Sequence, residues 1–197
     1  MKKMPTKEKI IYAALDLISE KGYDGVGVDL IAEHAGLKGP SLYRHFKGKE
    51  DIFRSIIDMV EIHYEEGFGL RSAEEAIPDS LDALVENAMK RILFTMNDES
   101  VRKTRRIMAM EQFRNERIAE MTSRYHLDNL QALYAKIFAG MMEKGLLVQD
   151  DPECLALEFA APVSLLIHMH DRQPERETEI MEKIRKHMEH FVKVYGK

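Results

Sequence analysis

The sequence predicts an all-α protein. Nearly every segment places apolar residues at spacings of three and four, the period of a helix with one buried face. No run alternates apolar and polar residues between turn signals, which is the pattern of a half-buried strand. The composition of 45% hydrophobic and 32% charged residues over 197 positions is that of a folded globular chain. We therefore expect about nine helices and no sheet.

The first two helices are delimited by glycines. Thr6 can cap the first helix and Gly22 can end it. A second helix is expected near residues 28–35, followed by Gly36. The first helix carries one apolar stripe, which consists of Ile10, Ile11, Ala14, Leu15 and Ile18.

A short third helix and a long fourth helix follow. The third is expected over residues 40–46, because the proline at its start suits a first helical position. Gly48 then interrupts the chain. Glu50 and Asp51 favour the beginning of the fourth helix, which reaches about Glu66, because acidic side chains stabilise a helix N-terminus.

Clusters of turn residues divide the remainder into about five more helices. The clusters lie at residues 77–80, 97–100, 114–116, 149–153 and 172–175.

The last two predicted helices are suited to pack against a second copy of the chain. The run from Pro152 to His170 contains CLALEFAAPVSLLIHM, in which Glu158 is the single charge, and a helix that is apolar nearly all round needs cover on both sides. We expect a homodimer through the last two helices. The alternative is that both helices only close a monomeric core. The final helix carries a packing stripe of Ile180, Ile184, Met188, Phe191 and Tyr195.

Other bulk features predict a cytoplasmic protein. No window reaches the roughly 18 consecutive apolar residues of a membrane-spanning helix. The N-terminus, MKKMPTKEKI, lacks the apolar stretch of a signal peptide. Cys154 is the single cysteine, and its apolar surroundings indicate a packing role rather than a reactive thiol.

The segment from Gly36 to Lys49 is basic in an acidic chain. It contains no Asp or Glu, although the formal net charge is -5. Two short helices joined at Gly36 have the spacing of a helix-turn-helix, with Ile31, Ala32, Ala35, Leu42 and Phe46 facing inward. The outward set suits phosphates and base edges, although an ordinary solvated face is the alternative. That set is Lys38, Gly39, Ser41, Tyr43, Arg44 and His45.

The segment VDLIAEHAGLKGPSLYRHFKGKEDIF closely resembles the N-terminal signature of the TetR family of transcriptional regulators. The resemblance covers about residues 6–55, and the rest of the chain matches in architecture. It implies a three-helix helix-turn-helix DNA-binding domain over 1–48. It also implies a helical effector-binding and dimerisation domain over 49–197.

The resemblance also implies roles for individual residues. Tyr43, His45 and Lys49 would hold DNA phosphates. Many relatives carry a phosphate-binding Thr where this chain has Val28, so a hydroxyl contact is missing there, although the backbone amide can still bind phosphate. Pro40 removes one amide donor. The residues implied to lie against the major groove or its edge are Lys38, Gly39, Pro40, Ser41 and Arg44.

The function implied is that of a ligand-responsive repressor, which binds a palindromic operator as a dimer and is released by a small, largely apolar effector. An activator of the same family, or a helical protein-interaction adaptor, is the alternative. The second domain is rich in methionine and aromatic residues, which suit an adaptable cavity as well as ordinary core packing. Candidate effector residues are Met59, His63, Phe94, Met108, Glu111, Phe113, Tyr125, Tyr134, Phe138 and Phe159.

Enzymatic and metal-binding roles find no support in the sequence. There is no nucleophile elbow, phosphate loop, dinucleotide fingerprint or zinc-protease helix. No His, Cys or carboxylate cluster has ligand spacing, so we expect no metal and no cofactor. The run RKTRR at 102–106 is expected to be a solvated helix face rather than a second DNA site.

Overall fold

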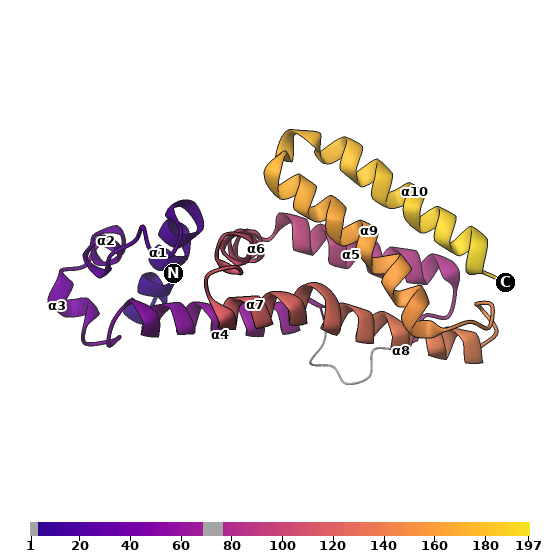
Figure 1. Ribbon diagram of the computed structural model, residues 1–197, viewed down its shortest axis with the longest axis horizontal. Helices are drawn as coiled ribbons and strands as arrows, with labels where there is room; N and C mark the ends of the chain where they lie inside the picture. Colours follow the sequence, from indigo (N-terminus) through magenta and orange to yellow (C-terminus); the bar gives the residue numbers. More distant parts are fainter. Residues whose placement is uncertain (1–3, 69–76) are drawn as a thin grey trace. The chain divides into compact units, whose positions relative to one another are not determined.

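The computed structural model describes residues 4–68 and 77–197, and this part of the chain is built from helices (Figure 1). It contains ten α-helices, one π-helical segment and one 3-10 segment. Within these residues there is no strand, only an isolated bridge between Leu147 and Gly196. The predicted fold class is confirmed.

The chain divides into two compact units. The head unit comprises Met1–Arg71 and Asp98–Glu116, and the second unit comprises Ser72–Asn97 and Arg117–Lys197. In its described residues the head unit holds five helices, which are α1 Thr6–Lys21, α2 Val28–His34, α3 Gly39–Leu42, α4 Lys49–Phe68 and α6 Glu99–Glu111. Two later helices, α4 and α6, thus belong to the same unit as the three helices that the sequence analysis assigned to DNA binding, and both pack against α1.

Glycine ends α1 as expected, but threonine does not cap it. Thr6 is already the first helical residue, and the N-cap position belongs to Pro5, without a side-chain hydrogen bond. Gly22 ends the helix with φ 74°, and its N–H donates to the carbonyl of Ile18 at 2.9 Å. Glycine suits this position because it has no Cβ to clash in the left-handed region.

The interior of the head unit is mostly aliphatic. Ile10, Ala14 and Ile18 of the predicted α1 stripe are fully buried, and Ile52 and Ile56 of α4 are buried as well. Such a stripe stabilises a helix through packing more than through intrinsic propensity.

The second unit contains the remaining helices. They are α5 Leu81–Asn97, α7 Glu116–Ser123, the π-helical segment η1 Arg124–Asp128, α8 Asn129–Glu143, α9 Pro152–Arg172, the 3-10 segment η2 Pro174–Arg176 and α10 Glu177–Tyr195. The sequence predicted about nine helices because α7 and α8 share one uninterrupted helical pattern. The π segment between them divides this run, and such segments are rare and occur mostly as single turns inside longer helices.

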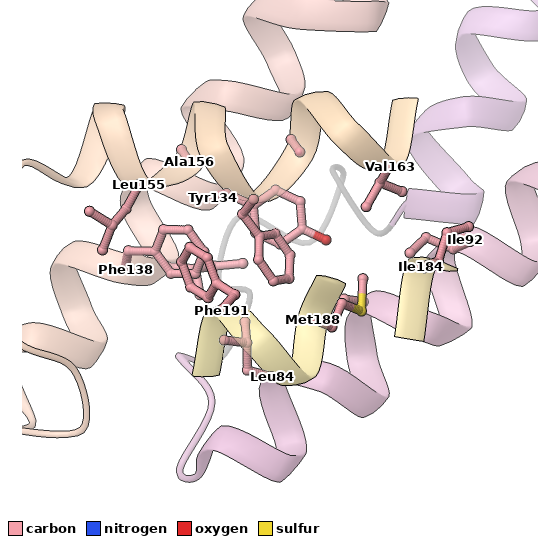
Figure 2. Packing of buried hydrophobic residues seen from close by; sticks show 14 of the residues in the cluster. Leu84, Ile92, Tyr134, Phe138, Leu155, Ala156, Val163, Ile184, Met188 and Phe191 are labelled. Atoms are coloured by element: carbon pink, nitrogen blue, oxygen red, sulfur yellow. The ribbon is translucent and has the colours of Figure 1, made fainter. Parts of the chain in front are cut away.

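An aromatic cluster fills the core of the second unit (Figure 2). The ring centroid of Phe138 lies 5.4 Å from that of Phe159 and 5.2 Å from that of Phe191. Tyr134 stands 4.8 Å from Phe159. Aromatic pairs at such distances add to the stability gained from area burial. Of the predicted α10 stripe, Ile180, Ile184, Met188 and Phe191 are buried in this core, and Tyr195 is half-buried against it.

Helix α9 buries one face and exposes another. Phe159 and Val163 point into the core, whereas Leu157 is 43% exposed and Leu165 is 66% exposed. By length and composition alone this helix could cross a membrane. That likeness is weak evidence, because core helices of soluble proteins share it, and α9 packs against α8 and α10.

Two expectations from the sequence need correction. Cys154 is exposed, because it lies in the first turn of α9 on the side away from the core, so it is not a buried packing residue. The run at 102–106 is not a uniformly solvated face. Thr104 and Arg105 are buried while Arg102 and Arg106 are exposed, since a basic run on a helix spans both its faces.

Candidate nucleic-acid interface

A tight glycine turn joins α2 to α3. Gly36 has φ 70°, and its N–H donates to the carbonyl of Glu33 at 2.9 Å. The N–H of Leu37 donates to the carbonyl of Ala32 at 2.8 Å. These two bonds satisfy carbonyls at the end of α2 and turn the chain sharply. The turn places α3 beside α2 as a helix-turn-helix requires.

The inward side of this motif is apolar as predicted. Ile31, Ala32, Leu42 and Phe46 are each at most 3% exposed, whereas Ala35 of the predicted inward set is half-buried. Helix α3 itself is shorter than expected and ends at Leu42, and a turn carries the chain on, in which the N–H groups of both His45 and Phe46 donate to the Leu42 carbonyl. Because Leu42 and Phe46 are both buried, they fix the backbone between them and hold its outward-facing side chains in place.

The outward side of α3 presents cationic and hydroxyl groups. Tyr43 is 57% exposed, and Lys38 stands at the N-cap position of α3. Five of the nine residues expected to bind DNA are exposed, namely Lys38, Pro40, Tyr43, Arg44 and His45. The other four are half-buried, namely Val28, Gly39, Ser41 and Lys49. All nine belong to the head unit.

An acidic side chain lies next to this basic face. Asp29, in the first turn of α2, is exposed, and its Oδ1 lies 3.5 Å from the place where a Cβ on Gly39 would stand. The segment from Gly36 to Lys49 contains no Asp or Glu, so the charge of this segment gave no indication that the carboxylate of Asp29 lies beside it. A carboxylate here repels phosphate but can accept a hydrogen bond from an amino group on a base edge.

The side chain of Lys49 is engaged within the head unit. Its Nζ donates to the backbone carbonyl of Tyr23 at 2.8 Å and lies 4.1 Å from the centroid of the Tyr23 ring. An ammonium group carries three hydrogens, so this bond leaves two for other acceptors. Burial, and then the carboxylates of Glu50, Asp24 and Glu111, raise the pKa of the Tyr23 hydroxyl.

The candidate effector residues fall in both units. Met59, Met108 and Glu111 lie in the head unit, where Met108 and Glu111 are buried. His63 is on α4, but its side chain lies outside the described residues. Phe113, in the loop after α6, is 89% exposed and lines no interior surface of the head unit.

The second unit brings three of the candidates together. Tyr134, Phe138 and Phe159 pack against one another in the aromatic cluster. Burial raises the pKa of the Tyr134 hydroxyl, although the positive charge of Arg91 and a hydrogen bond with it act in the opposite direction. Phe94 on α5 and Tyr125 on η1 are half-buried. Among the described residues, no group of His, Cys, Asp or Glu is placed to hold a metal ion.

Comparison with known proteins shows what this interface is similar to. Residues 10–56, which contain the helix-turn-helix, match the family of bacterial regulatory proteins known as the tetR family. The biofilm operon icaADBC HTH-type negative transcriptional regulator IcaR of Staphylococcus epidermidis is 27% identical over 161 residues, covering 82% of this chain and 78% of IcaR. The DNA-binding region of the chain is thus that of the tetR family, and most of the chain is similar to a TetR-family regulator. The family and this relative are DNA-binding transcriptional regulators rather than enzymes.

Solved structures of TetR-family regulators share the whole fold. A complex of SmeT with triclosan is 20% identical, with a TM-score of 0.77 over 98% of this chain and 92% of SmeT. SmeT is the repressor of the Stenotrophomonas maltophilia multidrug efflux pump SmeDEF. AibR, in complex with isovaleryl coenzyme A and operator DNA, is 22% identical, with a TM-score of 0.63 over 83% of this chain and 86% of AibR.

Proposed function

We propose that this TetR-family regulator is a cytoplasmic repressor that binds a palindromic operator as a homodimer and is released by a small, largely apolar effector. DNA binding is assigned to residues 1–48, and effector binding and dimerisation to residues 49–197. IcaR is named a negative regulator and SmeT a repressor, which favours repression over activation. An activator remains the second candidate within the family.

The observation that carries the DNA-binding assignment is the two-sided character of α3 and the turn after it. Leu42 and Phe46 are buried, whereas Tyr43, Arg44 and His45 between them are exposed. The buried pair fixes the backbone, so the three exposed side chains are held outward together. We assign phosphate contacts to Tyr43 and His45 and groove contacts to Arg44, because phosphate contacts position a protein while base contacts specify the sequence.

The outer face of α9 supports the proposed dimer. Leu157, Ala161 and Leu165 are exposed at spacings of four, with Cys154 preceding them on the same side of the helix. Burying one leucine side chain contributes about 1.5–3 kcal/mol, so a second copy of α9 gains stability by covering this face. A two-fold dimer then presents two reading helices to two half-sites of inverted sequence.

The proposed effector site lies in the second unit. Its core combines aromatic rings with the flexible side chains of Met96, Met141 and Met188. Methionine adapts to irregular apolar shapes, and the hydroxyl of Tyr134 supplies a polar group within this core. SmeT with triclosan and AibR with isovaleryl coenzyme A are relatives in fold that bind small molecules carrying apolar groups.

Selection from random-sequence DNA with the whole chain tests the proposed function. We expect enrichment of an inverted repeat bound by two chains, and placement of that repeat over a promoter should lower transcription in vitro. Leu165→Glu places a charge on the α9 face, so this variant should sediment as a monomer of about half the wild-type mass. A wild-type monomer, or enrichment of single half-sites, contradicts the dimer. Increased transcription establishes the activator instead.

A further inference from the structure

Tyr23, in the turn between α1 and α2, is held from two other helices of the head unit. Its N–H donates to Oε1 of Glu111 on α6 at 2.9 Å. Its carbonyl accepts from Nζ of Lys49 on α4 at 2.8 Å. Its ring centroid lies 4.8 Å from that of Phe53, also on α4. One residue thus connects α4 and α6 to the turn that leads into the helix-turn-helix.

The hydrogen bond that Glu111 accepts is partly buried in the head unit. Glu111 is 6% exposed, and it reaches a residue 88 positions earlier in the chain. A hydrogen bond to a carboxylate is stronger than one between neutral groups. Loss of this acceptor would also leave a backbone N–H without the partner it has in the structure. The contact therefore strongly favours one placement of the turn relative to α6.

The geometry around Gly22 makes this placement tight. A Cβ added to Gly22 would lie 3.2 Å from Oε1 of Glu111, closer than most real Cβ contacts. The carboxylate consequently lies directly against the backbone where α1 ends. Movement of Glu111 and movement of this turn are sterically linked, in addition to being joined by the hydrogen bond.

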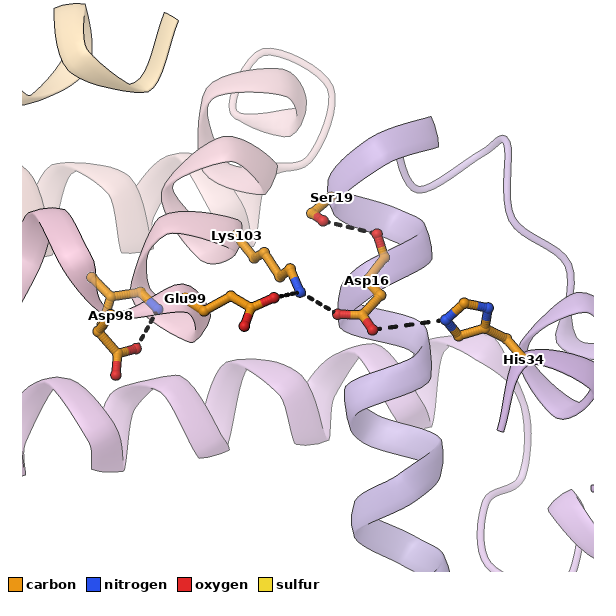
Figure 3. Close-up of polar contacts among 7 residues, drawn as sticks. Asp16, Ser19, His34, Asp98, Glu99 and Lys103 are labelled. Carbon is orange, nitrogen blue, oxygen red and sulfur yellow. Dashed lines mark hydrogen bonds and ion pairs between the residues drawn. The ribbon is translucent and has the colours of Figure 1, made fainter. Parts of the chain in front are cut away.

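A second set of contacts joins α6 to α1 (Figure 3). Lys103 donates from Nζ to Oδ1 of Asp16 at 2.6 Å and also pairs with Glu99. The other carboxylate oxygen of Asp16 lies 3.7 Å from Nε2 of His34, at the end of α2. Partial burial alone would lower the pKa of Lys103, but its hydrogen bonds to Asp16 and Glu99 outweigh that effect and raise the pKa. Helix α6 therefore contacts α1 at Asp16 and the turn after α1 at Tyr23.

We infer that Glu111 is a positioning residue for DNA binding, through which α6 sets the α1–α2 turn and with it the direction of the reading helix. The inference rests on the proposed function. It replaces the role in effector binding that the sequence analysis considered for Glu111, because the carboxylate is already committed to the backbone of Tyr23.

Three substitutions separate this role from general stabilisation. Glu111→Gln keeps an acceptor oxygen at the same reach. Glu111→Asp keeps the charge but withdraws the oxygens by one methylene, and Glu111→Met keeps the volume without an acceptor. Glu116→Met, at an exposed position shortly after α6, is the control.

The measurement is affinity for the selected DNA over a series of salt concentrations. We expect the Asp and Met variants to bind about tenfold or more weakly, as loss of a charged hydrogen bond allows, with the Gln variant and the control near wild type. The salt slope should stay unchanged in all of them, because no phosphate contact is removed. Wild-type affinity in the Asp variant, or a reduced slope, overturns the inference.

Hydrogen exchange at the Tyr23 amide provides a readout without DNA. Exchange should accelerate at Tyr23 in the Asp and Met variants and stay slow in the Gln variant. Should the Met variant fail to fold, the Asp and Gln pair decides the question. A wild-type chain that binds no DNA contradicts the proposed function, whereas unchanged Tyr23 exchange in the Asp variant contradicts the assignment of Glu111 itself.

Discussion

The head unit and the second unit keep their helices together by different means. In the second unit, aromatic rings on α8, α9 and α10 fill one core, and Phe138, Phe159 and Phe191 lie in mutual contact. In the head unit, the later helix α6 joins the DNA-binding motif partly through single polar contacts, from Lys103 to Asp16 and from Glu111 to Tyr23. Dense packing resists change, whereas a few directional bonds set an orientation that small changes can alter.

The largest expected effect concerns the core of the second unit. Phe138→Ala removes a fully buried ring and should lower the free energy of unfolding by about 3–5 kcal/mol. The control is Phe113→Ala, because this ring is 89% exposed and its loss should change stability by about 0.5 kcal/mol or less. Denaturant unfolding measures both. Equal losses would show that Phe138 is not packed as described.

A smaller effect is expected at the turn after α1. Gly22→Ala should cost about 1–2 kcal/mol, because a Cβ at φ 74° is strained. The added carbon also presses on Glu111, so DNA affinity should fall as well. Gly48→Ala is the matched control for stability, since its Cβ would meet nothing within 4 Å. Thermal unfolding that ranks Gly48→Ala as the more damaging change would contradict this account of the turn.

Lys49→Met tests whether this lysine contributes both to the stability of the fold and to phosphate binding. Loss of the contact with the Tyr23 ring should lower stability by about 0.5–1 kcal/mol. If the remaining hydrogens bind phosphate, the slope of log affinity against log salt should shrink by about one unit per subunit. We expect both effects. A stability loss with an unchanged slope would leave Lys49 with only the internal role, and Lys47→Met, at an exposed neighbouring lysine, is the comparison.

The smallest expected effect lies on the surface of α10. Hydrogen bonds from Arg176 and Lys183 lower the pKa of Glu179 from 4.5 to about 2. Because the folded pKa is the lower one, this stabilisation is present above pH 4.5 and is lost as the pH falls towards 2. Glu179→Gln should therefore melt slightly below wild type at neutral pH and together with it near pH 2. A difference that persists at that pH would assign the effect to another cause.

Local signals in the sequence predicted the parts of the structure that depend on local chemistry. Gly22 and Gly36 end α1 and α2 as expected, because positive φ angles favour glycine. The inward and outward faces of the helix-turn-helix followed from helical periodicity, and Leu42 and Phe46 are buried accordingly.

Contacts between distant segments could not be predicted in this way. Glu111 and Tyr23 are 88 positions apart, and no local pattern in the sequence around either residue indicates that the two are in contact. The burial of Arg105 and the exposure of Phe113 likewise depend on how α6 packs and where it ends, rather than on residue type. The sequence analysis assigned no role to Tyr23, although its backbone accepts a hydrogen bond from Lys49 on α4 and donates one to Glu111 on α6.

The most direct test of DNA binding by the head unit is a titration of selected DNA at salt concentrations from about 50 to 200 mM. Wild type is compared with Arg44→Ala in the head unit and Arg185→Ala on the exposed surface of α10. We predict that affinity falls steeply with salt, that Arg44→Ala weakens binding and relaxes base preference, and that Arg185→Ala matches wild type. Equal affinities for all three proteins, or no binding at the lowest salt concentration, would contradict the proposed interface.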